Sequence, residues 1–236
     1  FVSVGLLFLN YSKLRKYLSF NNLWNKEELK RFFNVNRDIF LRTLFLVLVN
    51  LFFVARGTRQ GDLILSANTL LMTFYTIFSY ISDGFAYAGE ALSGRYYGAK
   101  NIKVFNEIYT SLFKWGIGLA LIFTLLYLVL GLPFLSIITN EEQVVLAAKD
   151  YMIWAAMIPI VGIAAFVYDG IFIGITETRG MLISSFVAAC LFFVVSISTA
   201  TLLGNHGLWL AMLVFLGMRG LVQGIIMNKK IKTQWK

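Results

Sequence analysis

Several residue types on which enzymes commonly depend are nearly missing from this 236-residue sequence, which has one cysteine and one histidine. The single Cys190 excludes a disulfide framework and a cysteine-based metal cluster. The single His206 removes the commonest general base and metal ligand from most mechanisms. The sequence also has no nucleophile-elbow serine motif, phosphate-binding glycine loop or zinc-protease motif. It therefore predicts a protein that is not an enzyme and uses no cofactor.

Charged residues are scarce as well. They make up 14% of the chain, whereas hydrophobic residues make up 58%. Soluble domains have about 25% charged and about 45–50% apolar residues, so the composition excludes a soluble enzyme. Two prolines and 22 phenylalanines exclude a disordered chain. What remains is an integral membrane protein with several spans.

Six apolar segments are candidate membrane-spanning helices, because crossing about 30 Å of hydrocarbon takes about 20 helical residues. The first is short and contains Arg42 and Asn50, whereas the fifth contains no charged residue. The sequence thus predicts an all-α integral membrane fold, a bundle of six transmembrane helices. The segments are approximately Ile39–Val54, Leu63–Ser82, Val104–Leu130, Tyr151–Gly174, Met181–Leu203 and Gly207–Met227.

The distribution of Lys and Arg tests this count, since the formal net charge is +9. A nucleic-acid-binding protein gathers such residues on one face. Here they lie in the breaks between apolar segments, so no nucleic-acid partner is expected. Most of them fall before the first span, in every second loop and after the last span, and the opposite loops carry Arg56, Arg59 and Lys149. Because cytoplasmic loops are rich in Lys and Arg, both ends of the chain are predicted to be cytoplasmic, with the lipid bilayer around the bundle.

The region before the first span has a different character. Residues 1–9 are apolar but too short to cross a membrane, and basic residues follow them rather than precede them as in a signal peptide. We expect them to be the end of a truncated preceding helix. Residues 12–34 mix apolar and charged side chains, which favours either an amphipathic helix at the cytoplasmic interface or a solvated linker. The predicted division is 1–34 and a six-helix domain at 35–236.

Three acidic residues lie within or next to the apolar segments and are candidate functional groups, because a charge at the bilayer centre costs about 2.5–3.5 kcal/mol on insertion scales. Asp83 and Glu90 are seven residues apart, on one face of a helix, and Asp169 lies in the fourth segment. Such a carboxylate can bind and release H⁺ or coordinate Na⁺. The alternative is a buried ion pair, with Arg42 as the candidate partner, or with Arg95 in the case of Glu90.

Glycines and aromatic residues accompany these acids. Glycines such as Gly84 and Gly170 either allow close helix packing or permit local unwinding that forms a site. Pro159 is expected to kink the fourth span ahead of Asp169. Aromatic side chains, among them Tyr168, either attract lipophilic cations or face lipid.

Four stretches of the sequence carry a family resemblance. One reads SANTLLMTFYTIFSYISDGFAYAGEALSGRYYGAKN (Ser66–Asn101), and the others are Val35–Leu46, Ile153–Met181 and Gly204–Leu221. They resemble the multidrug and toxic compound extrusion (MATE) family and, within it, the DinF-like branch. The resemblance implies that the chain is the carboxy-terminal lobe of a twelve-helix antiporter of the inner (plasma) membrane, whose partner is a missing amino-terminal lobe. Such antiporters expel organic cations or other lipophilic compounds in exchange for H⁺ or Na⁺.

The resemblance also indicates where functional residues lie. NorM-type members have cation-binding carboxylates in the seventh and tenth helices. The seventh-helix counterpart here contains Arg42, Thr43 and Asn50 but no Glu, and Asp169 lies in the tenth-helix counterpart. The alternative function is a lipid or lipid-linked-sugar flippase of related architecture, whose basic cavity would use Arg42 and Lys114. The candidates for ion coupling or for lining the substrate cavity are Asp169, Asp83, Glu90, Arg42, Tyr168 and Asn50.

Overall fold

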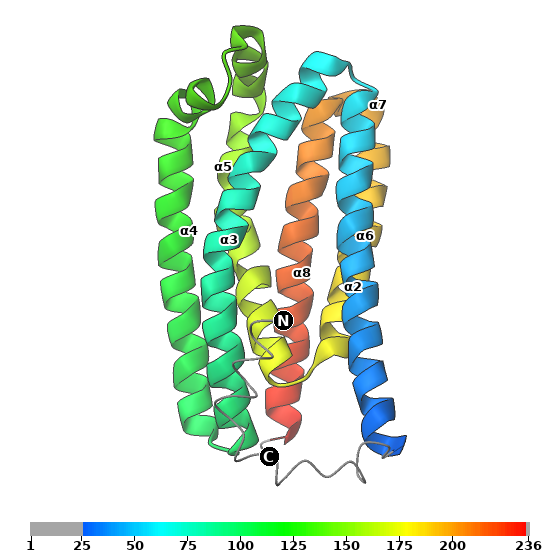
Figure 1. Cartoon of the computed structure of the whole chain (residues 1–236), viewed down its shortest axis with the longest axis vertical. Helices are drawn as coiled ribbons and strands as arrows, with labels where there is room; N and C mark the ends of the chain where they lie inside the picture. The colour runs from blue at the N-terminus through cyan, green and yellow to red at the C-terminus, as the bar shows by residue number, and fades with distance from the viewer. Residues whose placement is uncertain (1–25, 235–236) are drawn as a thin grey trace, which may run out of the picture. The chain divides into compact units, whose positions relative to one another are not determined.

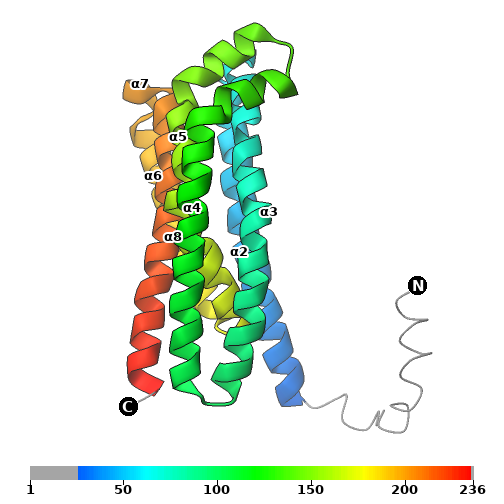
Figure 2. The ribbon, with the colours of Figure 1, turned by 90° about the vertical axis from the view of Figure 1, so that its left-hand side faces the viewer.

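The computed structural model describes residues 26–234, and all the regular structure in this part of the chain is helical. The chain divides into two compact units, residues 1–37 and 38–236, and the second unit holds the helical bundle of Figures 1 and 2. The helices are α2 (Lys26–Thr58), α3 (Asp62–Gly98), α4 (Ile102–Ile138), α5 (Glu142–Gly174), α6 (Thr178–Ser198), α7 (Ala200–Leu203) and α8 (Asn205–Gln234).

Six of these helices are long and apolar enough to cross a membrane, which confirms the predicted six-span, all-α fold. Most of them extend beyond the predicted segments, and α3 continues without a break through Asp83 and Glu90. Of the predicted amphipathic segment, residues 26–34 form the beginning of α2, and its remaining residues lie outside the described part of the chain. The choice between an interfacial helix and a linker, and the domain boundary at residue 35, stay predictions.

The fifth predicted span, Met181–Leu203, ends earlier than expected. Helix α6 ends at Ser198, and α7 is a separate short helix. Gly207 packs so closely on Thr199 that a Cβ atom there would lie 2.3 Å from the Thr199 hydroxyl oxygen. Gly204 adopts a positive φ of 52°, a conformation that favours glycine. The chain therefore turns between Thr199 and Gly204, and α8 begins beside the end of α6.

The helices of the second unit form two neighbouring groups. Helices α3, α4 and α5 pack on one another, α6 packs on α8, and α5 also packs on α8 (Figure 1). Helix α2 joins the second group through aromatic pairs, among them Phe52 with Phe192 and Phe53 with Trp209. Residues 165–172 of α5 are all buried. Because α5 lies between the two groups, its side chains contact both.

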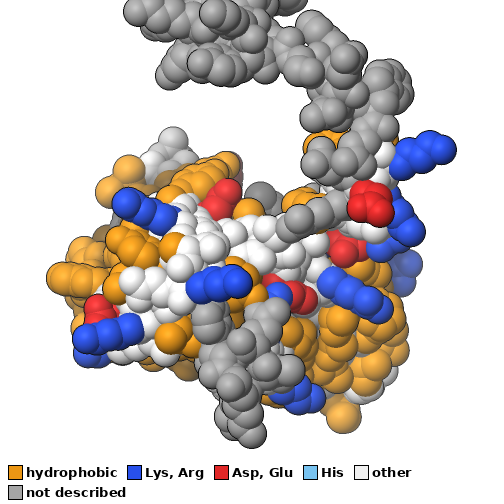
Figure 3. All heavy atoms as spheres, turned by 90° about the horizontal axis from the view of Figure 1, so that it is seen from below, with side chains coloured by type: hydrophobic (Ala, Val, Ile, Leu, Met, Phe, Trp, Pro, Cys, Tyr) orange, Lys and Arg blue, Asp and Glu red, His pale blue; other side chains and the backbone are white. Residues whose placement is uncertain are grey.

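The surface of the bundle is apolar along its length and basic at one end. Helix α4, for example, exposes Trp115, Leu125, Val129 and Ile137, as expected of side chains that face lipid. The basic end comprises the α3–α4 turn, the α5–α6 turn and the end of α8, and Figure 3 shows the blue side chains there. Its basic residues include Arg95, Lys100, Lys103, Arg179, Lys229 and Lys230.

Glycines allow helices α3 and α5 to approach closely next to Asp169. A Cβ atom on Gly170 would lie 2.1 Å from the Ala86 carbonyl oxygen, and one on Gly174 would lie 2.4 Å from the Glu90 carbonyl oxygen. Helix α5 is uninterrupted across Pro159, so the backbone beside the acid is packed rather than unwound. Of the two interpretations of these glycines, the structure favours close packing.

This contact predicts a stability difference between two glycine substitutions. Gly170→Ala should lower the free energy of unfolding by about 1–3 kcal/mol, because the new methyl group meets backbone atoms of α3 that have no room to move. Gly84→Ala is the matched control, since no atom lies within 4 Å of the Cβ position on Gly84. The midpoint of thermal unfolding in detergent would measure both. Equal midpoints for the two variants would contradict the close α3–α5 contact.

Candidate functional site

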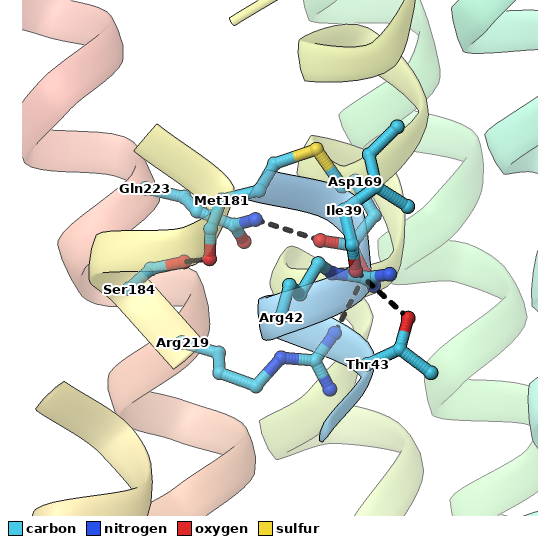
Figure 4. A network of polar contacts seen from close by, with 8 residues as sticks. All are labelled: Ile39, Arg42, Thr43, Asp169, Met181, Ser184, Arg219 and Gln223. Carbon is cyan, nitrogen blue, oxygen red and sulfur yellow. Dashed lines mark hydrogen bonds and ion pairs between the residues drawn. The ribbon is translucent and has the colours of Figure 1, made fainter. Parts of the chain in front are cut away.

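The structure brings polar side chains from three helices together around Asp169 (Figure 4). Asp169 belongs to α5, Arg42 to α2, and Arg219 and Gln223 to α8; we call these four residues the Asp169 cluster. The Asp169 Oδ2 atom accepts hydrogen bonds from the guanidinium groups of Arg42 and Arg219, at 2.6 Å for Arg219. The Oδ1 atom accepts a hydrogen bond from Gln223 Nε2 at 2.7 Å. One carboxylate thus connects α5 to both α2 and α8.

Helical periodicity places these side chains. Arg219 and Gln223 are four residues apart on α8, so they lie on one face, one turn from each other. Arg42 lies on the same side of α2 as Val49 and Phe53, which are buried in the core. Side chains of both α2 and α8 reach Asp169 because residues 165–172 of α5 are buried inside the bundle.

The Asp169 cluster is buried and carries an excess of positive charge. Arg219 is 2% exposed and Asp169 is 7% exposed. Two guanidinium groups face one carboxylate, and the Nε atoms of Arg42 and Arg219 have no hydrogen-bond partner among the described residues. Burying an uncompensated charge costs several kcal/mol. A further negative group in this region would therefore lower the free energy of the folded state.

Asp83 on α3 supplies a second carboxyl group in the same region. It is half-buried, and the charges of Asp169 and Arg42 both act on it. Within residues 26–234 its side chain forms neither a hydrogen bond nor an ion pair. Asp83 adds a second carboxyl group near the two guanidinium groups, and Asp38, buried one helical turn before Arg42 on α2, adds a third acidic side chain. Protonation of Asp83 makes this region more positive by one unit of charge.

The sequence left open whether Asp169 is a free functional carboxylate or part of a buried ion pair with Arg42. In the structure the ion pair is present. The sequence did not indicate that Arg219 and Gln223 would also bind Asp169. A signal was available, because Arg219 is an ionisable residue inside a span and such residues are paired or functional by default. Its partner could not be found from spacing, since Arg219 and Asp169 are on different helices.

Glu90 lies apart from this arrangement. Its side chain is half-buried, and in the described part of the chain it forms no ion pair with Arg95. The Arg95 guanidinium instead lies 5.5 Å from the centre of the Tyr96 ring. The backbone carbonyl of Glu90 is part of the close α3–α5 contact at Gly174. Glu90 therefore helps to position the two helices through its backbone.

The structure does not bring Tyr168 and Asn50 into the Asp169 cluster. The Tyr168 hydroxyl is 2.7 Å from the Tyr109 hydroxyl on α4, and the Tyr168 ring packs on Phe113. Asn50 is exposed on α2, and its Nδ2 atom donates to the Leu46 carbonyl at 3.2 Å. Tyr168 is buried and forms a second polar contact, between α4 and α5. Its role in a cavity stays a prediction, as does that of Asn50.

The basic groups that a flippase would need are arranged differently from that expectation. The Arg42 guanidinium is engaged by Asp169. Lys114 is exposed on α4 beside Trp115, on the lipid-facing surface described above. The shared basic cavity of a flippase stays a prediction.

Comparison with known proteins identifies the family. The MatE family model matches residues 39–198, which include Arg42, Asp83 and Asp169. The chain belongs to the MatE family. Members of this family are membrane transporters rather than enzymes, as the sequence resemblance implied.

Two curated relatives agree with the MatE assignment. The chain is 39% identical over 192 residues to DNA damage-inducible protein F of Escherichia coli (strain K12), covering 81% of this chain and 42% of that protein. It is 28% identical over 191 residues to Protein DETOXIFICATION 45, chloroplastic, of Arabidopsis thaliana, covering 75% of this chain and 32% of that protein. The first match supports the DinF-like branch. The chain spans less than half the length of either relative.

The charge balance of the Asp169 cluster predicts a strong energetic coupling between its members. Asp169→Asn should lower the free energy of unfolding by about 3–5 kcal/mol, because it leaves two buried guanidinium groups without a carboxylate. Adding Arg219→Gln to that variant removes one of them, so the two effects should be non-additive by about 1–3 kcal/mol. Thermal or denaturant unfolding of the single and double variants would measure this coupling.

Asp62→Asn serves as the control for loss of an acid, since Asp62 is exposed in the first turn of α3. It should leave the unfolding midpoint within about 0.5 kcal/mol of the parent protein. Strictly additive effects of Asp169→Asn and Arg219→Gln would show that the cluster contributes no pairwise energy.

Proposed function

We propose that this chain is one lobe of a secondary active antiporter that exports organic cations or other lipophilic compounds in exchange for H⁺ or Na⁺. Membership of the MatE family supports a transport function. The partner in this proposal is an amino-terminal lobe of the same polypeptide, against which the lobe rocks during transport. The protein would lie in the inner (plasma) membrane with both ends of this chain in the cytoplasm, in keeping with the basic end of the bundle.

The observation that carries the proposal is that the charges of Asp169 and Arg42 act on Asp83, whose own side chain is half-buried and has no polar partner among the described residues. Both oxygens of the Asp169 carboxylate already accept hydrogen bonds. A proton or Na⁺ arriving at Asp169 would therefore have to displace existing contacts. Asp83 can take up a cation without breaking any contact to a described side chain. We assign the exchange of the coupling ion to Asp83. Asp169 has a structural role in this proposal, because it connects α5 to α2 and α8.

Charge balance explains how an ion at Asp83 could change the shape of the protein. Ionised Asp83 offsets part of the positive charge of Arg42 and Arg219, and its protonation makes the region more positive by one unit of charge. An excess charge is far more costly in a closed, dry interior than in one open to water. Protonation therefore favours the conformation in which water reaches this region, and such a differential shifts the conformational equilibrium.

The same balance makes a proton and an organic cation compete. A cationic substrate near Asp83 is attracted by the ionised carboxylate and repelled when that group is protonated. Binding of one therefore favours release of the other, which is the requirement for exchange. Na⁺ is the alternative coupling ion, and the Asp83 carboxylate would hold it together with carbonyl or hydroxyl oxygens.

Transport measurements on the full-length protein in proteoliposomes would test this assignment. The vesicles are loaded with a fluorescent organic cation, and a pH gradient or a Na⁺ gradient is imposed separately. Asp83→Asn should reduce gradient-driven cation transport by about tenfold or more, because the exchangeable charge is lost. Its unfolding midpoint should stay close to that of the parent, since Asp83 makes no contact that the substitution removes.

Asp169→Asn should reduce both transport and stability, whereas Asp62→Asn should change neither. Gradient-driven transport that is unchanged in Asp83→Asn would remove Asp83 from the coupling mechanism, and unchanged transport in Asp169→Asn would remove Asp169. Transport driven by the Na⁺ gradient alone would assign Na⁺ as the coupling ion.

A further inference from the structure

Two arginines lie at the end of the bundle opposite the basic end. Arg56 is in the last turn of α2 and Arg59 is in the α2–α3 connection, at the same end as α7 (Figure 1). In the described part of the chain, neither forms an ion pair with a carboxylate. Membrane proteins concentrate Lys and Arg on the cytoplasmic side, so two arginines at the opposite end call for an explanation.

Both arginines line a cavity of about 300 Å³. Its walls come from the end of α2, the α2–α3 connection, the end of α6, α7 and the first turn of α8. The cavity is thus formed by segments far apart in the sequence that meet at one end of the second unit. The lining residues are Arg56, Arg59, Gln60, Ser196, Ala200, Thr201, Gly204 and Leu208.

The polar part of this lining can donate hydrogen bonds, and among the described residues no acidic side chain belongs to it. Arg56 and Arg59 contribute guanidinium groups and Thr201 a hydroxyl group, whereas the Gln60 Nε2 atom already donates to the Arg56 carbonyl and to Asn205 Oδ1, each at 3.5 Å. Ser196 is 2% exposed, and its hydroxyl oxygen has no hydrogen-bond partner among the described residues. This oxygen is enclosed, as are the unpartnered hydroxyl oxygens of Ser82, Thr124 and Ser185, so Ser196 forms part of the cavity wall and is not counted as a donor to a ligand.

The start of α8 adds to this preference for negative charge. Gly204 and Leu208 belong to the lining, and α8 begins at Asn205 between them. The first backbone N–H groups of a helix have no partner within the helix, and its N-terminus carries a partial positive charge. Anions such as phosphate therefore bind readily at this position when other donors surround it.

Exposed apolar residues adjoin the cavity in the sequence. Ile197, next to Ser196, is 62% exposed, and Leu202, next to Thr201, is 85% exposed. These two side chains do not line the cavity, but they expose apolar surface on α6 and α7, the helices that contribute Ser196 and Thr201 to it. We propose that this cavity binds a phosphate-ester anion, through the two guanidinium groups and the hydroxyl group of Thr201. The source is either the headgroup of an anionic phospholipid or a soluble phosphate.

Ligand-dependent stabilisation of the purified full-length protein tests this proposal independently of transport. The probes are a short-chain phosphatidylglycerol, inorganic phosphate and a short-chain diacylglycerol that lacks the phosphate, each added to the protein in a non-ionic detergent. Phosphatidylglycerol should raise the midpoint of thermal unfolding. The double variant R56Q/R59Q should bind it about tenfold or more weakly, because charge-assisted hydrogen bonds are lost.

Two further variants separate a defined cavity from general attraction to positive charge. Lys149→Gln removes an exposed charge from the same end without touching the lining, so it should leave binding unchanged. Thr201→Leu keeps both arginines but removes a donor and fills part of the cavity, so it should weaken binding by severalfold. The proposed site would be overturned if Lys149→Gln lost as much binding as R56Q/R59Q. It would also be overturned if binding were unchanged in Thr201→Leu or in R56Q/R59Q.

The probes identify the source of the anion. Stabilisation by phosphatidylglycerol but not by inorganic phosphate would assign a lipid headgroup, and stabilisation by inorganic phosphate alone would assign a soluble phosphate. Equal stabilisation by diacylglycerol, or no stabilisation by either phosphate-containing probe, would overturn the proposal.

Discussion

A carboxylate enclosed in a helix bundle needs cations within hydrogen-bonding distance, because several kcal/mol are lost when a charge is buried alone. In this protein Arg42 and Arg219 meet that need for Asp169, and Gln223 binds the remaining carboxylate oxygen. The contact connects three helices that are distant in sequence. The interior of the bundle is therefore organised by one acidic group as well as by apolar packing.

The position of α5 makes this arrangement feasible. Its enclosed segment lies between α3 and α4 on one side and α8 on the other, and Gly170 lets α3 approach within backbone contact. That approach brings α3, and with it Asp83, into the field of the Asp169 cluster. Small residues and buried charge act together here, since a larger side chain at position 170 would separate the helices that carry the two carboxyl groups.

The two ends of the bundle differ in how they use positive charge. At one end, Lys and Arg are numerous and belong to turns, and Lys230 pairs with Glu177 near the end of α8. At the other end, Arg56 and Arg59 line a cavity without an acidic partner among the described residues. The first pattern follows from the orientation of a membrane protein. The second has the chemistry of a binding site for an anion.

The sequence by itself determined the fold class, the number of spans and the presence of acids inside them, because these depend on composition and on the length of apolar segments. It also placed Asp83 and Glu90 on one helix face, since that follows from 3.6 residues per turn. Tertiary structure alone decided that Arg219 and Gln223 bind Asp169, and that Tyr168 contacts Tyr109 instead. Adjacent residues of a helix point about 100° apart, so neighbours in sequence reach different helices. The packing of whole helix faces determines which helix each side chain contacts. The spacing of residues along the sequence does not show how those faces pack.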